Sequence, residues 1–230
     1  MSSDLYDTHF YQRRRQATLH AARRILGLVH AQTSFRSAVD FGCGTGTWLS
    51  VAKELGAERV RGYEGLWLKA EWLDEPGLNV RPVALDQPLP EVGSYDLAIS
   101  LEVAEHLPAP RAESFVAELC AAAPNILFSA APPGQTGDGH VNERWPDYWV
   151  TLFAAKGYGL RDVIRQHVWD DAEIPYWYRQ NCLLFVRGAA EMRTGPLNIV
   201  HPEQFMALQK RQEDLSVRAL LAAAFRRVWI

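Results

Sequence analysis

The sequence predicts an α/β fold: a doubly wound, mostly parallel sheet with helices on both faces, plus N-terminal and C-terminal helical appendages. Two observations carry this prediction. Short apolar segments typical of buried strands alternate with segments of helix length from about residue 35 to 188, which favours parallel strands joined by crossover helices. The first strand also runs into a glycine-rich turn over residues 42–46 and then a helix, as such sheets often begin.

The N-terminal half of the chain is expected to supply a long helix and four strands. Residues 8–29 have an apolar stripe at helical spacing with arginines on the opposite face. Four short apolar or alternating runs, each bounded by turn residues, predict strands over 38–41, 59–63, 78–85 and 95–101. Between and after them, helices are expected over 48–55, 66–73 and 111–122.

The C-terminal half continues the alternation and then changes character. The pattern predicts strands over 125–129, 160–168 and 181–186, a loop over 130–139 and a helix over 144–156. The segment 193–196 is typical of a linker, and a helix with an apolar stripe follows over 203–228. That stripe either packs on the same domain or forms a homodimer interface. We therefore expect a helical lid over 1–34, a binding domain over 35–188, and a linker with a C-terminal helix over 189–230.

Composition excludes several function classes. The chain has 230 residues, of which 48% are hydrophobic and 22% charged, and its formal net charge is −3, so no nucleic-acid partner is expected. The cysteines Cys43, Cys120 and Cys182 are scattered, which favours neither a disulfide framework nor a zinc site and fits a reducing cytoplasm. No apolar run approaches the ~20 residues that span a bilayer, and no signal pattern opens the chain, so no membrane partner is expected.

The glycine-rich turn indicates a cofactor site. Alternate glycines let the backbone approach a ligand without a Cβ, and the N–H groups of the turn and helix start can hold an anionic group. A dinucleotide site has the pattern G-x-G-x-x-G, but Thr47 stands at the third glycine position here and Gly46 comes one residue earlier. With Asp40 before Gly42 and Gly44, the segment resembles motif I of the class I (Rossmann-like) S-adenosylmethionine-dependent methyltransferases.

Acidic residues at the ends of predicted strands fit the same site. Glu64 ends the second strand, where a carboxylate can accept hydrogen bonds from both ribose hydroxyls of a cofactor. Asp86 ends the third strand and can accept from an adenine amino group. Asp40 is expected behind them, near the cofactor's amino group or holding the N–H groups of the turn. Because ligands bind beyond the carboxyl ends of parallel strands, we expect these three acids in one crevice.

A second motif strengthens the resemblance. An apolar strand leads into Glu102-Val103-Ala104-Glu105-His106-Leu107, which is similar to the fourth-strand motif of class I methyltransferases acting on small molecules. The resemblance covers roughly residues 36–187. It implies a seven-stranded sheet with an antiparallel last strand, S-adenosyl-L-methionine as methyl donor and S-adenosyl-L-homocysteine as product. The cofactor-binding residues that we expect are Asp40, Gly42, Gly44, Gly46, Glu64, Asp86, Leu101, Glu102 and, from the N-terminal lid, Tyr11.

Methyl transfer suggests which residues do the chemistry. A sulfonium methyl group needs a nucleophile held in line at close range, and a hydroxyl nucleophile needs a base, for which histidine is suited near neutral pH. We expect His140 as the base, because its glycine-containing loop follows the fifth strand and should lie over the crevice. His106 is the rival base and Glu143 a further catalytic candidate. Alternatively, His140 orders its loop by bonding Glu143, and His106 caps a turn.

Two aromatic-rich blocks, residues 132–149 and 176–181, are expected to build the acceptor pocket. Aromatic faces can stack on sugar rings or hold cations, although buried scaffold is the default interpretation for half of these side chains. Both blocks are similar to segments of a bacterial branch of the family linked to carbohydrate or natural-product pathways. The substrate-binding residues that we expect are Trp149, Tyr176, Tyr178 and Arg179.

Several alternatives stay open. Asp138, His140 and Glu143 with His106 offer oxygen and imidazole ligands, but their spacing fixes no coordination geometry, so we assign no metal. The leading hypothesis is methylation of a small molecule at oxygen. The others are N-methylation of a small amine, a non-catalytic methyltransferase-like subunit, and a nicotinamide-dependent oxidoreductase, which Thr47 disfavours.

Overall fold

The computed structural model describes the backbone of residues 8–228 and the side chains of residues 16–214, 216 and 217. The strands are β1 (Ser37–Phe41), β2 (Arg59–Glu64), β3 (Val80–Pro82), β4 (Leu97–Leu101), β5 (Asn125–Ser129), β6 (Tyr158–Arg161) and β7 (Leu183–Arg187). The α-helices are α1 (Thr8–Thr33), α2 (Thr47–Glu54), α3 (Ala112–Ala122), α4 (Pro146–Ala155), α5 (Arg165–Val168), α6 (Tyr176–Asn181) and α7 (Pro202–Val228). Short 3₁₀ turns are η2 (Ala70–Trp72), η3 (Ala104–His106) and η4 (Ala109–Arg111).

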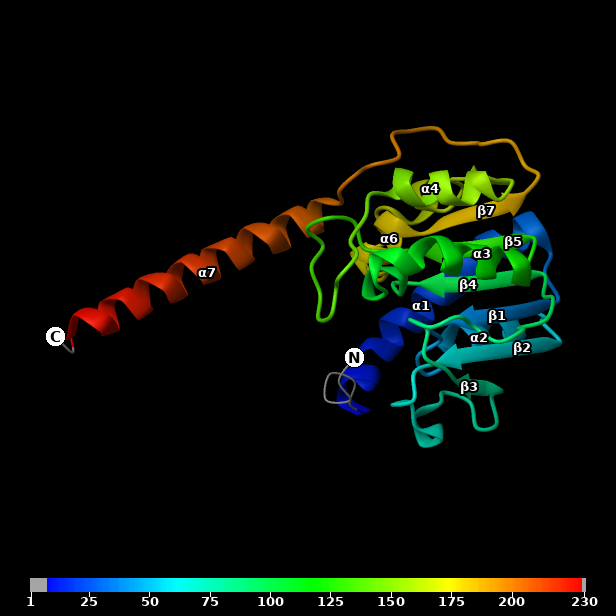
Figure 1. Ribbon diagram of the computed structural model, residues 1–230, viewed down its shortest axis with the longest axis horizontal. Helices are drawn as coiled ribbons and strands as arrows, with labels where there is room; N and C mark the ends of the chain where they lie inside the picture. The colour runs from blue at the N-terminus through cyan, green and yellow to red at the C-terminus, as the bar shows by residue number, and fades with distance from the viewer. Residues whose placement is uncertain (1–7, 229–230) are drawn as a thin grey trace.

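The strands form one seven-stranded sheet in the order β3-β2-β1-β4-β5-β7-β6 (Figure 1). Strands β1 to β5 pair in parallel. Strand β7 is antiparallel to both of its neighbours, β5 and β6. The predicted doubly wound sheet with an antiparallel last strand is therefore confirmed. The order reverses between β1 and β4, and that edge is where ligands bind in such sheets.

Helices bury both faces of the sheet, which is why the central strands are mostly apolar. Side chains of β1 alternate, so that Val39 and Phe41 face α3 and α4 while Ala38 faces α1 and α2. All five residues of β1 and all five of β4 are buried, as expected for parallel strands covered on both sides. In Figure 1, α3 and α4 lie in front of the sheet and α1 and α2 behind it.

Three predicted elements are shorter than expected. Segment 66–73 contains only the turn η2, because Leu66 is exposed and the segment buries no apolar face. Strand β3 ends at Pro82, although the next N–H, that of Val83, still donates to the Glu64 carbonyl at 2.8 Å. The segment 160–168 is a strand only to Arg161 and then turns into α5, where Arg165 and Asp162 form a buried ion pair.

Helix α7 projects from the body of the protein (Figure 1). Its first turn is anchored, because Arg179 donates to Glu203 at 2.5 Å and Gln180 donates to Gln204 at 2.7 Å. Val217 belongs to the predicted apolar stripe and is 53% exposed. Val217 therefore does not pack on the domain, and the other side chains of the predicted stripe lie outside the described residues. Although α1 and α7 have 26 and 27 residues, no helix within the described residues is apolar enough to cross a bilayer.

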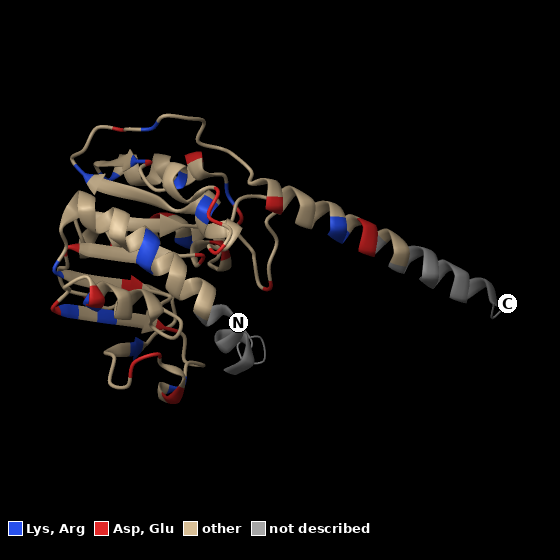
Figure 2. Ribbon diagram, turned by 180° about the vertical axis from the view of Figure 1, so that it is seen from behind, with Lys and Arg blue, Asp and Glu red and all other residues tan. Residues whose placement is uncertain are grey.

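Figure 2 shows the Lys and Arg positions of the described residues scattered over several elements. Several of these residues form ion pairs. Arg23 of α1 donates to Glu54 of α2 at 2.9 Å, and Lys53 forms an ion pair with Glu75. Exposed pairs of this kind contribute little stability. They do neutralise positive charge, and no continuous basic stripe is visible on the face shown in Figure 2.

Trp149 belongs to the hydrophobic core, which corrects the expectation that it contacts the acceptor. Helix α4 turns it toward the sheet, where it is 2% exposed and its ring lies 5.2 Å from that of Phe128. The physical reason is the helical period, since the inward face of α4 carries Trp149 and Phe153 four residues apart.

Replacing Trp149 with alanine should lower the free energy of unfolding by about 3–5 kcal/mol, because it leaves a large cavity in the core. Trp145, one turn earlier in the chain, is 37% exposed, and Trp145→Ala should cost less than about 1 kcal/mol. Urea unfolding followed by circular dichroism measures both. Equal stabilities of the two variants would contradict this placement.

Candidate functional site

A cavity of about 400 Å³ opens at the carboxyl ends of β1, β2 and β4. Its walls come from the turn after β1, the ends of β2 and β4, the loop 135–140 and helix α6. This is the edge at which the strand order reverses, and therefore the edge where the doubly wound fold predicts a ligand. The sequence-predicted residues that line it are Asp40, Gly42, Gly44, Glu64, Leu101, Glu102, His106, His140, Tyr176 and Tyr178.

Other candidates lie outside the cavity. Asp86 is exposed because β3 stops four residues before it, and Leu85 lines the cavity in its place. Arg179 is buried but points toward α7, where it donates to the carbonyl of Trp169 at 3.0 Å and to Glu203. A buried guanidinium requires such partners, so Arg179 anchors α7 and does not reach the acceptor. The side chain of Tyr11 lies outside the described residues.

The glycine-rich turn adopts a backbone that explains its sequence. Gly42, Gly44 and Gly46 have φ values of 83°, 54° and 86°, in the left-handed region that favours glycine. A Cβ on Gly42 would lie 2.3 Å from Val103 Cγ2, and one on Gly46 would lie 2.1 Å from Leu78 Cδ2. Val103 and Leu78 therefore pack against Gly42 and Gly46, and of the three glycines Gly42 and Gly44 line the cavity.

Two buried carboxylates face this turn. Glu64 accepts from the N–H groups of Gly44 at 2.6 Å and Gly65 at 2.8 Å. Asp40 is 2% exposed, and its Oδ2 has no hydrogen-bond partner among the described residues. Burial raises the pKa of Glu64, while burial and the Glu64 charge raise the pKa of Asp40 well above its usual value. Both groups are suited to accept hydrogen bonds from hydroxyl or amino groups of a ligand.

Glu102 stands in a strained, well-held position at the end of β4. Its φ is 56°, which is uncommon for a residue with a side chain and often occurs at functional sites. Gln135 donates to its Oε2 at 2.6 Å and Asn181 to its Oε1 at 3.1 Å. Burial raises the pKa of Glu102, and hydrogen bonds from Asn181, Ser129 and Gln135 oppose that rise.

Gln135 and Asn181 were missed by sequence reasoning. Asn181 also donates to the side-chain oxygen Oε1 of Gln135 at 2.8 Å, so the two side-chain amides join the loop after β5 to α6. Each lies inside a block that the sequence singled out for its aromatic residues. The available signal was Asn181, a polar residue just before the apolar strand β7. A polar side chain at such a position is expected to be buried and to need a hydrogen-bond partner.

Glu143 organises the loop over the cavity. Its carboxylate accepts from the N–H groups of Gly134 and Thr136, each at 2.8 Å, and from Nδ1 of His140 at 2.8 Å. Because an ionised carboxylate only accepts, the proton of a neutral His140 resides on Nδ1, and Nε2 is left as an acceptor. Glu143 thus does not line the cavity itself but fixes the tautomer and orientation of a histidine that does.

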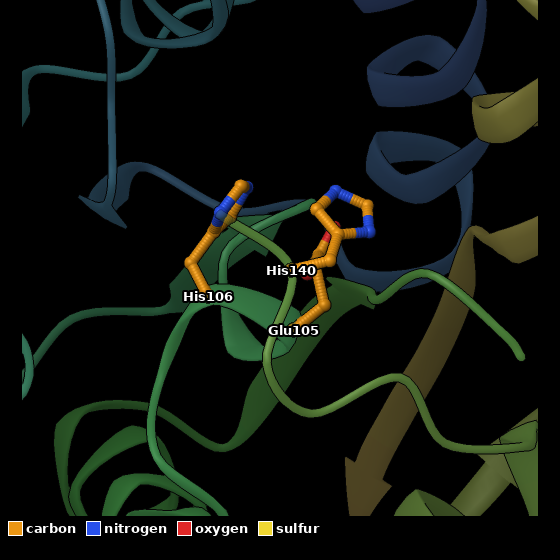
Figure 3. Close-up of side chains that lie close together, drawn as sticks. All are labelled: Glu105, His106 and His140. Carbon is orange, nitrogen blue, oxygen red and sulfur yellow. The ribbon is translucent and has the colours of Figure 1, made fainter. Parts of the chain in front are cut away.

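Glu105, His106 and His140 converge beside the cavity (Figure 3). The two imidazole rings meet edge to face with centroids 4.8 Å apart. Glu105 is fully buried, and no well-formed hydrogen bond reaches either of its carboxylate oxygens from the described residues. Burial and the neighbouring His140 lower the pKa of His106 to about 4, so His106 is neutral at pH 7. Burial and the Glu102 charge raise the pKa of Glu105 well above its usual value.

Comparison with known families gives one match. Residues 11–160 match the family model described as "Methyltransferase domain", which spans more than half of the chain. No curated protein matches the sequence.

Solved structures share this fold at low sequence identity. Magnesium protoporphyrin IX methyltransferase from Synechocystis PCC 6803 with bound SAH has a TM-score of 0.54 and 19% identity, covering 75% of this chain and 83% of that one. The sugar N-methyltransferase KedS8 from Streptoalloteichus sp ATCC 53650 has a TM-score of 0.60 and 14% identity, covering 80% and 94%. CalS10, a SAM-bound amino pentose methyltransferase from Micromonospora echinaspora, has a TM-score of 0.57 and 16% identity, covering 79% and 98%. The predicted fold-level resemblance is thereby confirmed.

Replacing Glu143 with alanine should loosen the loop over the cavity. Each backbone N–H left without its acceptor costs about 1–3 kcal/mol, and ~1.4 kcal/mol corresponds to a factor of ten in an equilibrium. Amide hydrogen exchange over residues 134–142 should therefore become at least about tenfold faster. Glu113→Ala, on an exposed site of α3, is the matched control. Unchanged exchange in the Glu143 variant would show that another contact orders the loop.

Proposed function

Because this chain belongs to the methyltransferase domain family, we propose that it methylates a hydroxyl group of a small molecule in a carbohydrate or natural-product pathway. The enzyme is an S-adenosylmethionine-dependent methyltransferase of the EC 2.1.1 class, with S-adenosylhomocysteine as product. The observation that carries the oxygen acceptor is His140, whose Nδ1 is bonded to Glu143 and whose ring lines the same cavity as the glycine-rich turn.

The residues around the turn fit the cofactor. The left-handed glycines Gly42 and Gly44 leave room for a ligand to approach the backbone. Glu64 would accept hydrogen bonds from the ribose hydroxyls of the cofactor. The unpartnered Oδ2 of Asp40 would accept from the cofactor's amino group or from the N–H groups of the turn. Leu101 and Glu102 would border the methionine part. When bound, S-adenosylmethionine supplies a methyl group on a positively charged sulfur.

The chain's own residues supply the proton chemistry. Nε2 of His140 is left as an acceptor by the Glu143 contact at Nδ1, and His140 lines the cavity together with residues 135–138 of its loop. Glu143 stabilises the imidazolium that forms when Nε2 takes the acceptor's hydroxyl proton. His106, the rival base, has a pKa lowered to about 4 and is therefore the weaker proton acceptor at pH 7.

The cavity supports a small and uncharged or cationic acceptor. Its volume of about 400 Å³ lies in the range of small-molecule sites. Tyr176 and Tyr178 of α6 line one wall, where aromatic faces can stack on a sugar ring. Glu64, Glu102 and Glu105 also line the cavity, and this acidic lining disfavours a polyanionic nucleic acid.

The N-terminal and C-terminal segments also have roles in this proposal. Thr18 of α1 lines the cavity, which supports a role for residues 1–34 as its lid. We assign residues 35–188 to the binding domain and 189–230 to a linker and helix. The exposed Phe205 and Met206 of α7 are the side chains that a homodimer would cover.

N-methylation is the second candidate. The acidic lining of the cavity suits a protonated amine, and two of the similar solved structures are a sugar N-methyltransferase and an amino pentose methyltransferase by their descriptions. A panel of matched sugars that carry either a hydroxyl or an amino group at the same carbon separates the two candidates by the rate of S-adenosylhomocysteine release.

The variant Gly44→Asp should lose binding of S-adenosylhomocysteine, because its side chain would fill the space against the turn and add negative charge beside Glu64. Gly157→Asp is the matched control: it also places a side chain on a left-handed glycine, at φ 81° compared with 54° for Gly44, outside the cavity lining. Isothermal titration calorimetry, with NAD as the negative ligand, compares both with the natural protein. Binding retained in a folded Gly44→Asp protein would remove the cofactor from this turn.

His140→Ala should lower kcat for a hydroxylated acceptor by ~10²–10⁴-fold. His167→Ala replaces an exposed histidine outside the cavity and should leave kcat within about twofold of the natural protein. Steady-state kinetics with the first acceptor found in the panel gives both values. A loss of only a few-fold would exclude His140 from proton transfer.

A further inference from the structure

We propose that Glu105, His106 and His140 bind a divalent first-row transition-metal ion at the wall of the cavity. Ion binding is argued from these residues alone. The role given to the ion at the end rests on the proposed function, and the experiments below separate the two.

The geometry of the three side chains supports a coordination site. Each offers one ligand atom, and these atoms all lie within 4.8 Å of one another (Figure 3). Bonds of about 2.0–2.2 Å to a common ion bring ligand atoms to about 3–4 Å apart, so modest side-chain rotations close the site. Two imidazoles and one carboxylate are a common ligand set for zinc and for iron, with further positions left open.

Among the described residues, the ligand atoms have few competing partners: only backbone groups of Glu105 and Ala131 interact as donors with the carboxylate, and the backbone of Gly139 with His106. Glu105 is fully buried, and both carboxylate oxygens lack a well-formed hydrogen bond from the described residues. Nδ1 of His106 is likewise buried without a partner. An unpaired buried carboxylate is costly, and buried charges are normally paired or coordinate metals. A cation between Glu105 and the two histidines would supply the missing partner of the buried carboxylate and of His106 Nδ1.

Neighbouring contacts hold the ligands in place. The backbone carbonyl of Glu105 accepts from the N–H groups of Val141 and Asn142, each at 2.9 Å, which ties η3 to the loop that carries His140. Glu143 accepts from Nδ1 of His140 at 2.8 Å and leaves Nε2 for an ion. A carboxylate that orients the second nitrogen of a histidine is the usual support of a metal ligand.

A second group of potential ligands lacks these properties. His20, Asp171 and Glu173 also come together, but His20 already pairs with Asp171 at 3.1 Å, and the Glu173 side chain is 80% exposed. These groups are satisfied by one another and by solvent. They serve as the internal control for metal binding.

The position of the ion gives it a role. Glu105, His106 and His140 all line the cavity, so the open positions of the ion face the acceptor. An ion there would lower the pKa of an acceptor hydroxyl, whose proton leaves to water. The oxygen then forms its bond to the methyl carbon as the carbon–sulfur bond breaks. In the ion-bound enzyme His140 is a ligand, and the ion replaces it as the group that promotes deprotonation.

Titration of chelator-treated full-length protein with Mn²⁺, Zn²⁺ and Co²⁺ tests the site. We expect one ion per chain, and ligand-field absorption bands with Co²⁺. His140→Ala, in the loop, and His106→Ala should each weaken binding at least about 100-fold, whereas Glu143→Gln should weaken it about 10-fold as a supporting residue. Asp171→Asn, in the control group, should leave affinity and spectrum unchanged. Glu105→Gln tests the buried carboxylate, with circular dichroism as the check on its fold.

The outcomes are separable. Equal affinity in the natural protein, His106→Ala and His140→Ala overturns the site, as does the absence of ion binding in a protein that still binds S-adenosylhomocysteine. Full methyl transfer after chelation overturns the role of the ion and keeps His140 as base. Ion binding that depends on these residues, in a protein that methylates no hydroxyl acceptor, supports the site and overturns the proposed acceptor.

Discussion

The site depends on one constraint: carboxylates are buried where the strands end, and a buried carboxylate must find donors. Glu64 finds them in the backbone of the glycine-rich turn. Glu102 finds them in the amides of Gln135 and Asn181, and Glu143 finds them in the loop over the cavity. Glu64 and Glu102 therefore line the cavity while they satisfy their own hydrogen bonds, and Glu143 orders the loop beside it.

Two acids are left without a full set of donors, Asp40 and Glu105. They lie in separate parts of the cavity, Asp40 under the turn after β1 and Glu105 in η3 after β4. In a folded protein such groups are exceptions that call for an explanation. One of these acids lies beside the glycine-rich turn, and the other lies beside His106 and His140.

The sequence predicted those features that depend on neighbours in the chain. The turn after β1 is local, and its alternate glycines follow from left-handed φ values that other residues rarely adopt. Glu64 and Glu102 could be placed because strand ends meet at one edge of a parallel sheet. Neither inference needs to know how a distant segment packs.

Prediction failed where a side chain's direction depends on contacts between distant elements. Asp86 was placed by a strand that in fact ends early at Pro82, and Trp149 was assigned to a pocket although its helix turns it into the core. Arg179 faces α7 because Glu203 and the Trp169 carbonyl lie on that side. Periodicity gives the faces of a helix, but only the fold determines what each face meets.

Helix α6 has only six residues, and it serves two regions at once. Tyr176 and Tyr178 line the cavity, while Arg179 and Gln180 donate hydrogen bonds to the first turn of α7. Because this helix is so short, the wall of the cavity that it forms and the first turn of α7 are held together as one unit. A partner that binds α7 would thus influence the shape of the cavity, although the partner contacts no residue that lines the cavity.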